Sequence, residues 1–189
     1  MGPTKRFLSQ ALILGLVLLP VATGCTNKQG ESESPVFITT QIGLNPGIVN
    51  IAVPAPVQFP TITLQSHLKN PTASDPQHFQ DVNITSYVVS YSRVDGGTKV
   101  PAPETFGGAQ GLLPSGGTQT LTNFPGMYAY ALTQSPFDQL LPFNGGIDLE
   151  TGRTEIDLRF TFVFYGETVA GTRVASEPAS APLIFVYQP

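Results

Sequence analysis

The sequence predicts an all-β protein, an antiparallel two-sheet sandwich of about seven to nine strands. From residue 36 onward, apolar side chains recur at every second position in many short segments, which is the period of a strand with one buried face. The 19 glycines and 18 prolines supply frequent turns. No long pattern of helical period separates the segments. A small barrel is the competing architecture.

Residues 154–165 form the clearest strand of the chain. Large apolar residues alternate there with Glu, Asp, Arg and Thr, and their β-branched and aromatic content suits a half-buried, pleated surface. A helix would scatter the same apolar side chains around its circumference. One face of this strand therefore belongs to the core, and its residues are Ile156, Leu158, Phe160, Phe162 and Phe164.

Residues 82–94 form a second long strand with an irregularity near its start. Tyr87, Val89 and Tyr91 share one face, whereas Ile84 falls out of phase with them. One extra residue in the strand restores the phase, because it shifts every later side chain to the other face. We therefore expect a β-bulge at residues 85–86.

Shorter strands complete the two sheets, and each is bounded by Gly, Pro or Asn. One short helix is expected at residues 135–141, because Ser135 can cap its first turn, Pro136 suits the first helical position and Asp138 complements the helix dipole. The shorter strands are expected at 36–42, 57–68, 118–124, 128–133, 172–176 and 183–187.

The first 24 residues have the pattern of an export signal. Lys5 and Arg6 precede an apolar stretch at residues 7–21, which is short for a membrane span, and small residues follow it. Cys25 comes next and is the only cysteine, so an intramolecular disulfide cannot form. No later segment has 18 consecutive apolar residues.

The run Val21-Ala22-Thr23-Gly24-Cys25 resembles the lipobox of bacterial lipoproteins. The resemblance implies cleavage before Cys25, acylation of that residue with palmitate or similar chains, and a stable anchor in a membrane outside the cytoplasm. Thr26 stands where lipoproteins retained at the inner membrane often have Asp, which favours the outer membrane if the host has two. The expected organisation is a signal peptide at 1–24, a lipidated tether at 25–34 and a sandwich domain at 35–189.

A second resemblance concerns the fold. Residues 84–97, followed by Val100-Pro101-Ala102-Pro103, are similar to a recurring pattern in uncharacterised bacterial envelope proteins with immunoglobulin-like sandwiches. Residues 162–171 are similar to the penultimate strand and hairpin of the same group. The resemblance implies an immunoglobulin-like β-sandwich and no site residues. Because the Cys and Trp pair of antibody domains is absent, it extends to the architecture alone.

Charge and motifs narrow the functional classes. The formal net charge is −4, and after the signal the basic residues are spread singly, so no basic surface is available for nucleic acid. The sequence has no nucleophile elbow, zinc-protease motif, P-loop or dinucleotide-binding glycine pattern. We therefore expect a non-enzymatic protein without a cofactor; an unrecognised hydrolase is the remaining enzymatic alternative.

Two groups of side chains have metal-binding chemistry, although solvated loops explain both more simply. Imidazole together with carboxylate suits zinc or a similar ion, and the loop after the second strand contains His67, Asp75, His78 and Asp81. Carboxylates near paired glycines can bind calcium, but the spacing here matches no calcium loop. The second group is Asp148, Glu150, Glu155 and Asp157 beside Gly145 and Gly146.

A glycine-flanked insertion between strands carries clustered aromatic and proline residues. Its surface could receive a partner or a sugar ring, or it could pack over the end of the sandwich. The absence of Trp weakens the case for a sugar. The sequence therefore favours an envelope protein whose sandwich has a structural or protein-interaction role; the alternative is a glycan- or metal-binding envelope module. The candidate contact residues are Tyr128, Tyr130, Phe137 and Phe143.

Overall fold

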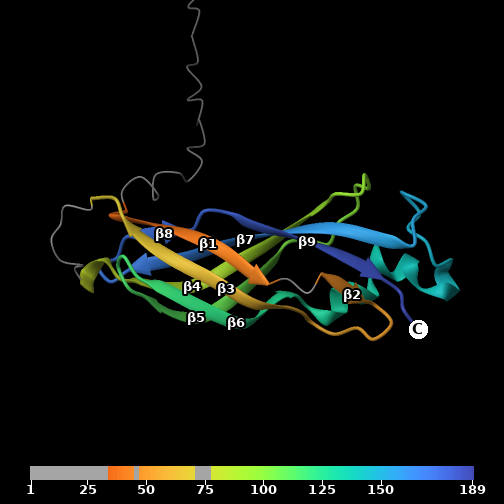
Figure 1. Ribbon diagram of the computed structural model, residues 1–189, viewed down its shortest axis with the longest axis horizontal. Helices are drawn as coiled ribbons and strands as arrows, with labels where there is room; N and C mark the ends of the chain where they lie inside the picture. Colours follow the sequence, from red (N-terminus) through yellow and green to blue (C-terminus); the bar gives the residue numbers. More distant parts are fainter. Residues whose placement is uncertain (1–33, 45–46, 71–77) are drawn as a thin grey trace, which may run out of the picture.

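The computed structural model describes residues 34–44, 47–70 and 78–189, which form two β-sheets packed face to face (Figure 1). One sheet has the order β1-β3-β6. Its strands are β1 (Val36–Leu44), β3 (Val57–Leu68) and β6 (Thr118–Met127). The other sheet has the order β2-β9-β7-β4-β5, with β8 beside β7. Its strands are β2 (Ile48–Asn50), β4 (Val82–Arg93), β5 (Glu104–Leu113), β7 (Glu155–Thr168), β8 (Arg173–Ala175) and β9 (Ala179–Val186). The predicted all-β sandwich is confirmed.

The strands agree with the alternation of apolar and polar residues in the sequence. β7 buries every second residue from Ile156 onward, and β3 has the bounds that the pattern predicted. The predicted bulge in β4 is confirmed, because the register of β4 shifts between Ile84 and Ser86 against both β5 and β7. The shift lets Ile84 and Tyr87 point into the same core, where both are buried.

Several strand features differ from the expectation. Residues 128–133 are not a strand; Ala129–Thr133 is the 3-10 helix η2, in which the Ala131 N–H bonds to the Tyr128 carbonyl. β5 was missed because glycines interrupt its alternation, and β2 because it is very short. β2 also runs parallel to β9, so the sandwich is not wholly antiparallel.

The expected helix at 135–141 is a single turn within a longer insertion. It is the 3-10 helix η3 (Phe137–Leu140), which lies between η2 and a third 3-10 helix, η4 (Pro142–Asn144). Ser135 does not cap the backbone as expected; its hydroxyl accepts a hydrogen bond from the Gln139 side chain. A fourth turn, η1 (His78–Gln80), precedes β4.

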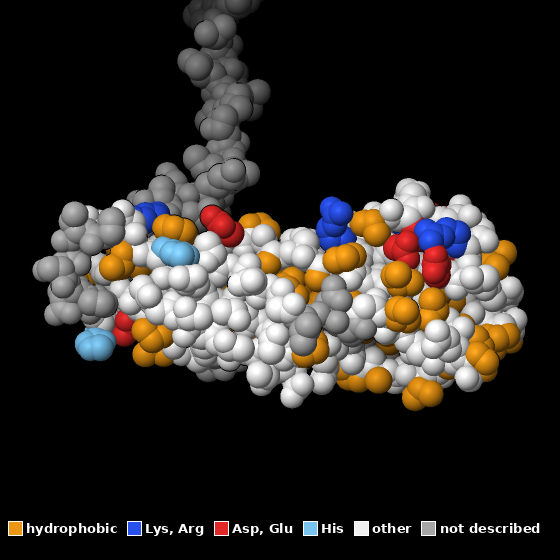
Figure 2. All heavy atoms as spheres, viewed as in Figure 1, with side chains coloured by type: hydrophobic (Ala, Val, Ile, Leu, Met, Phe, Trp, Pro, Cys, Tyr) orange, Lys and Arg blue, Asp and Glu red, His pale blue; other side chains and the backbone are white. Residues whose placement is uncertain are grey.

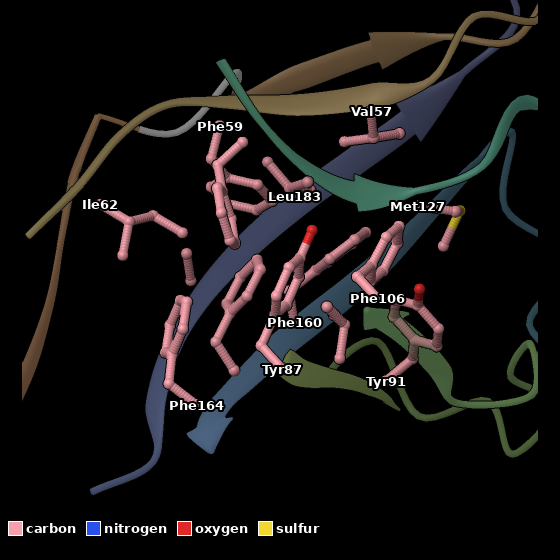
Figure 3. Packing of buried hydrophobic residues seen from close by; sticks show 14 of the residues in the cluster. Val57, Phe59, Ile62, Tyr87, Tyr91, Phe106, Met127, Phe160, Phe164 and Leu183 are labelled. Atoms are coloured by element: carbon pink, nitrogen blue, oxygen red, sulfur yellow. The ribbon is translucent and has the colours of Figure 1, made fainter. Parts of the chain in front are cut away.

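Aromatic rings from both sheets fill the space between them (Figure 3). Phe160 of β7 is fully buried and contacts Phe59 of β3, Tyr91 of β4 and Phe185 of β9. The Tyr91 hydroxyl donates to the Gly126 carbonyl at 2.8 Å, which satisfies its polar atom within the core. Within the described ranges, no helix is long and apolar enough to cross a membrane.

The two ends of the sandwich differ. The described chain begins at Ser34 beside the start of β1, whereas η2, η3 and η4 lie together at the opposite end (Figure 1). The loop between β4 and β5 and the segment 145–153 lie toward that opposite end as well. Cys25, the signal peptide and nearly all of the tether lie outside the described residues.

Candidate functional site

Large apolar side chains are exposed on the segments that lie toward the end of the sandwich remote from the start of β1. Tyr128 is 43% exposed, Tyr130 57%, Phe143 81% and Leu149 69%. They come from the end of β6, from η2 and η4, and from the segment before β7. We call these four residues the aromatic end. Exposed apolar side chains that gather in this way are typical of interaction surfaces.

A chain of ring contacts connects two residues of the aromatic end, Tyr128 and Tyr130, to the core. Tyr87 stacks on Phe106 with their ring centroids 4.7 Å apart, and Phe106 lies 4.7 Å from Tyr128. Tyr130 lies 6.0 Å beyond Tyr128. Because Tyr87 and Phe106 are buried, the exposed rings of Tyr128 and Tyr130 extend a series of ring contacts that begins in the core. Such rigid aromatic side chains lose little conformational entropy on binding a partner.

A buried carboxyl group fixes the backbone at the start of this surface. Glu104 of β5 is buried, and its Oε2 accepts a hydrogen bond from the Tyr128 N–H at 3.0 Å. Burial raises the pKa of Glu104, and the Tyr128 N–H offsets part of that rise by stabilising the carboxylate. Glu104 therefore holds the Tyr128 backbone at the point where the chain passes from β6 into η2. Sequence reasoning missed it, because nothing near Glu104 marks its carboxyl as buried.

Phe137, the fourth aromatic residue of the expected contact set, lies in the core. Its exposed fraction is 0%, and its ring centroid is 4.5 Å from that of Phe185 on β9. Leu140 of the same turn is also buried. The insertion thus does both things that the sequence allowed: η3 packs over the end of the sandwich, while Tyr128, Tyr130 and Phe143 remain exposed.

Arg93 holds together the two loops at this end. Its guanidinium donates to both carboxylate oxygens of Asp95 at 2.7 Å and to Oδ2 of Asp148 at 2.7 Å. The side chains of Arg93, Asp95 and Asp148 are almost completely buried. Burial alone would raise the pKa of Asp95, but the bonds from Arg93 and from the N–H groups of Asp157 and Gly97 hold it well below its usual range.

The four carboxylates considered for calcium have protein partners. Asp148 is buried against Arg93, so it is not a solvated turn residue. Glu150 accepts from the N–H groups of Thr98 and Lys99. Glu155 and Asp157 both pair with Arg153. The guanidinium groups of Arg93 and Arg153 and backbone N–H groups therefore hold at least one oxygen of each carboxylate, whereas Oδ1 of Asp148 and Oδ1 of Asp157 are buried and accept no hydrogen bond.

The residues considered for zinc do not come together as one site. His67 lies on β3, where it stacks on Phe37 and its Nε2 is 2.9 Å from the Thr39 hydroxyl. His78 lies in η1 with its Nδ1 3.2 Å from Oδ2 of Asp81. Asp75 lies outside the described residues. Among the residues that are described, no three His, Cys, Asp or Glu side chains form a group suited to a metal ion.

A small cavity lies between β1 and the segment after β8, near the start of the domain. Its volume is about 250 Å³, and Val36, Ser34 and Ser176 are among its lining residues. The Ser34 hydroxyl donates to the Val36 carbonyl, and the Ser176 hydroxyl accepts from the Phe164 N–H. Among the described residues, the lining of the cavity includes no histidine.

No protein-family model matches this chain, and no curated protein matches it. A functional assignment must therefore come from its own residues. The aromatic end is the surface that combines exposed apolar area with a rigid supporting structure.

Proposed function

We propose that this protein is a non-enzymatic lipoprotein of the cell envelope, held outside the cytoplasm by lipid on Cys25, and that its aromatic end binds a partner protein. The observation that carries the proposal is the exposure of Tyr130 in η2 and Phe143 in η4, two helices that lie toward the end of the sandwich opposite the start of β1 (Figure 1). A lipid anchor before Ser34 would leave that end directed away from the membrane.

The chemistry of the aromatic end suits a protein partner. Tyr and Phe are enriched at the centres of protein interfaces, and Tyr contributes both contact area and a hydroxyl for hydrogen bonding. The Arg93 cluster joins the neighbouring loops, so the surface is presented in one arrangement before binding. A preformed aromatic surface of this kind favours a structural or adaptor role in an envelope assembly.

Replacement of Cys25 tests the anchor. We expect Cys25→Ser to abolish incorporation of radiolabelled palmitate, because the chain has no other cysteine thiol to carry the lipid. The measurement is labelling of growing cells followed by membrane fractionation. Ser34→Ala, a change at the start of the domain, is the control and should leave labelling unchanged. Membrane retention of Cys25→Ser with unaltered labelling would refute the lipid anchor.

Crosslinking from the aromatic end tests the partner. A photoreactive amino acid at position 130 should capture a reproducible protein in native cells, and Tyr130→Ala should reduce co-purification of that protein at least about tenfold, since interface Tyr residues often contribute about 2 kcal/mol or more. Position 169 is the matched control, because Val169 is 62% exposed but lies in the hairpin between β7 and β8 at the other end. Equal capture from positions 130 and 169 would contradict the proposal.

A further inference from the structure

The sheet β1-β3-β6 has no charged residue in any of its three strands. The charged residues of the strands all belong to the other sheet, for example Arg93 on β4, Glu104 on β5 and Arg159 on β7. Figure 2 shows the result as a broad band of uncharged side chains over β3 and β6, with charged side chains toward its margins. Surfaces designed for solubility contain roughly 25–35% charged residues, so an exposed sheet face without charge is a distinct feature.

Threonine hydroxyls are arranged regularly on this face. The apolar residues of β3 point into the core, and the alternate residues of β3 and β6 point outward. These outward residues lie opposite each other in register, and the hydroxyl oxygens of Thr63 and Thr120 are 3.5 Å apart. We call this surface the threonine face; its residues are Thr61, Thr63 and Gln65 of β3 and Thr118, Thr120 and Thr122 of β6.

β1 adds hydroxyl and amide side chains from a third strand to this surface. Thr39 lies opposite Gln65, and Gln41 lies opposite Thr63. Next to them, toward the start of the domain, Phe37 stacks on His67 with their ring centroids 4.7 Å apart. Strands are about 4.8 Å apart and rise about 3.3 Å per residue. Hydroxyl and amide groups therefore recur over about 10 Å across the strands and about 13 Å along β6, which suits an extended polymer better than a single small molecule.

The composition of the threonine face determines which polymer it fits. Anionic polymers are bound through Arg and Lys, which are absent here. Interface cores between proteins are enriched in aromatic residues, Met and Arg, and the face has few of these. Hydroxyl and amide groups both donate and accept hydrogen bonds, as do the hydroxyl groups of a neutral sugar.

We propose that the threonine face binds a neutral polysaccharide, which lies across β3 and β6 and forms hydrogen bonds with their hydroxyl and amide groups. The site lies on the side of the sandwich, apart from the aromatic end, so it does not depend on the partner protein proposed above. β6 pairs only with β3 within the described sheets and carries no charge that would protect an edge strand from other chains. A polysaccharide lying over β6 would cover that edge.

The test uses the full-length lipidated protein in detergent micelles and electrophoresis through gels that contain one polysaccharide each. The neutral probes are a β-glucan, an α-glucan, a mannan and a galactan, and alginate is the anionic comparison. We expect retardation by at least one neutral probe and none by alginate. Thr120→Lys should weaken the retarding interaction at least tenfold, about 1.4 kcal/mol, because the ammonium group would have no counter-charge in a neutral ligand.

Ser180→Lys is the matched control, because Ser180 is an exposed position of β9 in the charged sheet. It adds the same charge and should leave retardation unchanged, while circular dichroism verifies that both variants are folded. Absence of retardation by every neutral probe, or equal retardation of Thr120→Lys and the unaltered protein, would overturn the proposal. Self-association that Thr120→Lys abolishes, without polysaccharide binding, would also overturn it, because a second copy would then occupy the face. Capture of a protein from position 130 is a separate result and can succeed or fail independently.

Discussion

Arg93→Ala is expected to reduce the free energy of unfolding by about 3–5 kcal/mol at neutral pH, because removal of one member of a buried ion pair leaves a buried charge without a partner. Here two carboxylates, those of Asp95 and Asp148, would lose the guanidinium that contacts both at 2.7 Å. Arg93→Lys should reduce the free energy of unfolding by less than Arg93→Ala does. It should still destabilise the protein, because an ammonium group cannot reproduce the forked geometry of the guanidinium. Urea unfolding monitored by circular dichroism measures all three proteins.

Arg153→Ala is the matched control for this prediction. Arg153 also pairs with two carboxylates, those of Glu155 and Asp157, but its side chain is 41% exposed. Exposed ion pairs contribute about 0–1 kcal/mol, so its loss should be small. Equal losses for Arg93→Ala and Arg153→Ala would show that burial of the Arg93 cluster does not contribute to stability.

The pH dependence provides a second test of the same cluster. Asp95 and Asp148 have pKa values below their ordinary value of 3.8 in the folded protein, despite burial, because Arg93 and nearby N–H groups stabilise the carboxylates. A lowered folded pKa means that this stabilisation is complete above about pH 4 and is lost as the pH falls through the folded values. The difference in the free energy of unfolding between the unaltered protein and Arg93→Ala should therefore be smaller at pH 3 than at neutral pH. At pH 3 the unpaired carboxyl groups of the variant can be protonated.

Phe160→Ala is expected to destabilise the fold by about 3–5 kcal/mol, the usual cost of removing a buried aromatic side chain. Phe160 is fully buried and joins the two sheets, because it contacts Phe59 on one and Tyr91 and Phe185 on the other. The neighbouring change Arg159→Ala removes an exposed side chain from the same strand and should alter stability by about 0.5 kcal/mol or less. Thermal and urea unfolding measure both variants, and similar effects would contradict this assignment of the core.

The contacts of Arg93 show where sequence reasoning was insufficient. Asp148 was favoured as a solvated turn residue, since an Asp near paired glycines is usually exposed. It is buried because β4 and β7 bring Arg93 to the segment before β7, although 55 residues separate the two side chains in the chain. The sequence around Arg93 or Asp148 does not indicate that the two side chains come into contact. The same reason explains why Glu104, which accepts a hydrogen bond from the Tyr128 N–H, was missed.

Residues 128–133 illustrate a different failure. Their alternation of Tyr and Ala is compatible with a strand, but β6 ends at Met127 and residues 128–133 pair with no strand of the described sheets. The backbone therefore satisfies its hydrogen bonds locally, as in the bond from the Ala131 N–H to the Tyr128 carbonyl. A strand requires a partner, so the outcome depends on which strands the fold places nearby.

The sequence by itself determined the elements whose signal is local. Alternating apolar residues predicted β3, β4 and β7 and the bulge between Ile84 and Ser86, because each strand must turn one face to the core. Only the tertiary structure decided which loops meet at Arg93, which aromatic residues of the insertion are buried, and that the threonines of β3 and β6 lie in register on one uncharged face. Those features depend on contacts between distant segments, and the pairing of strands sets such contacts.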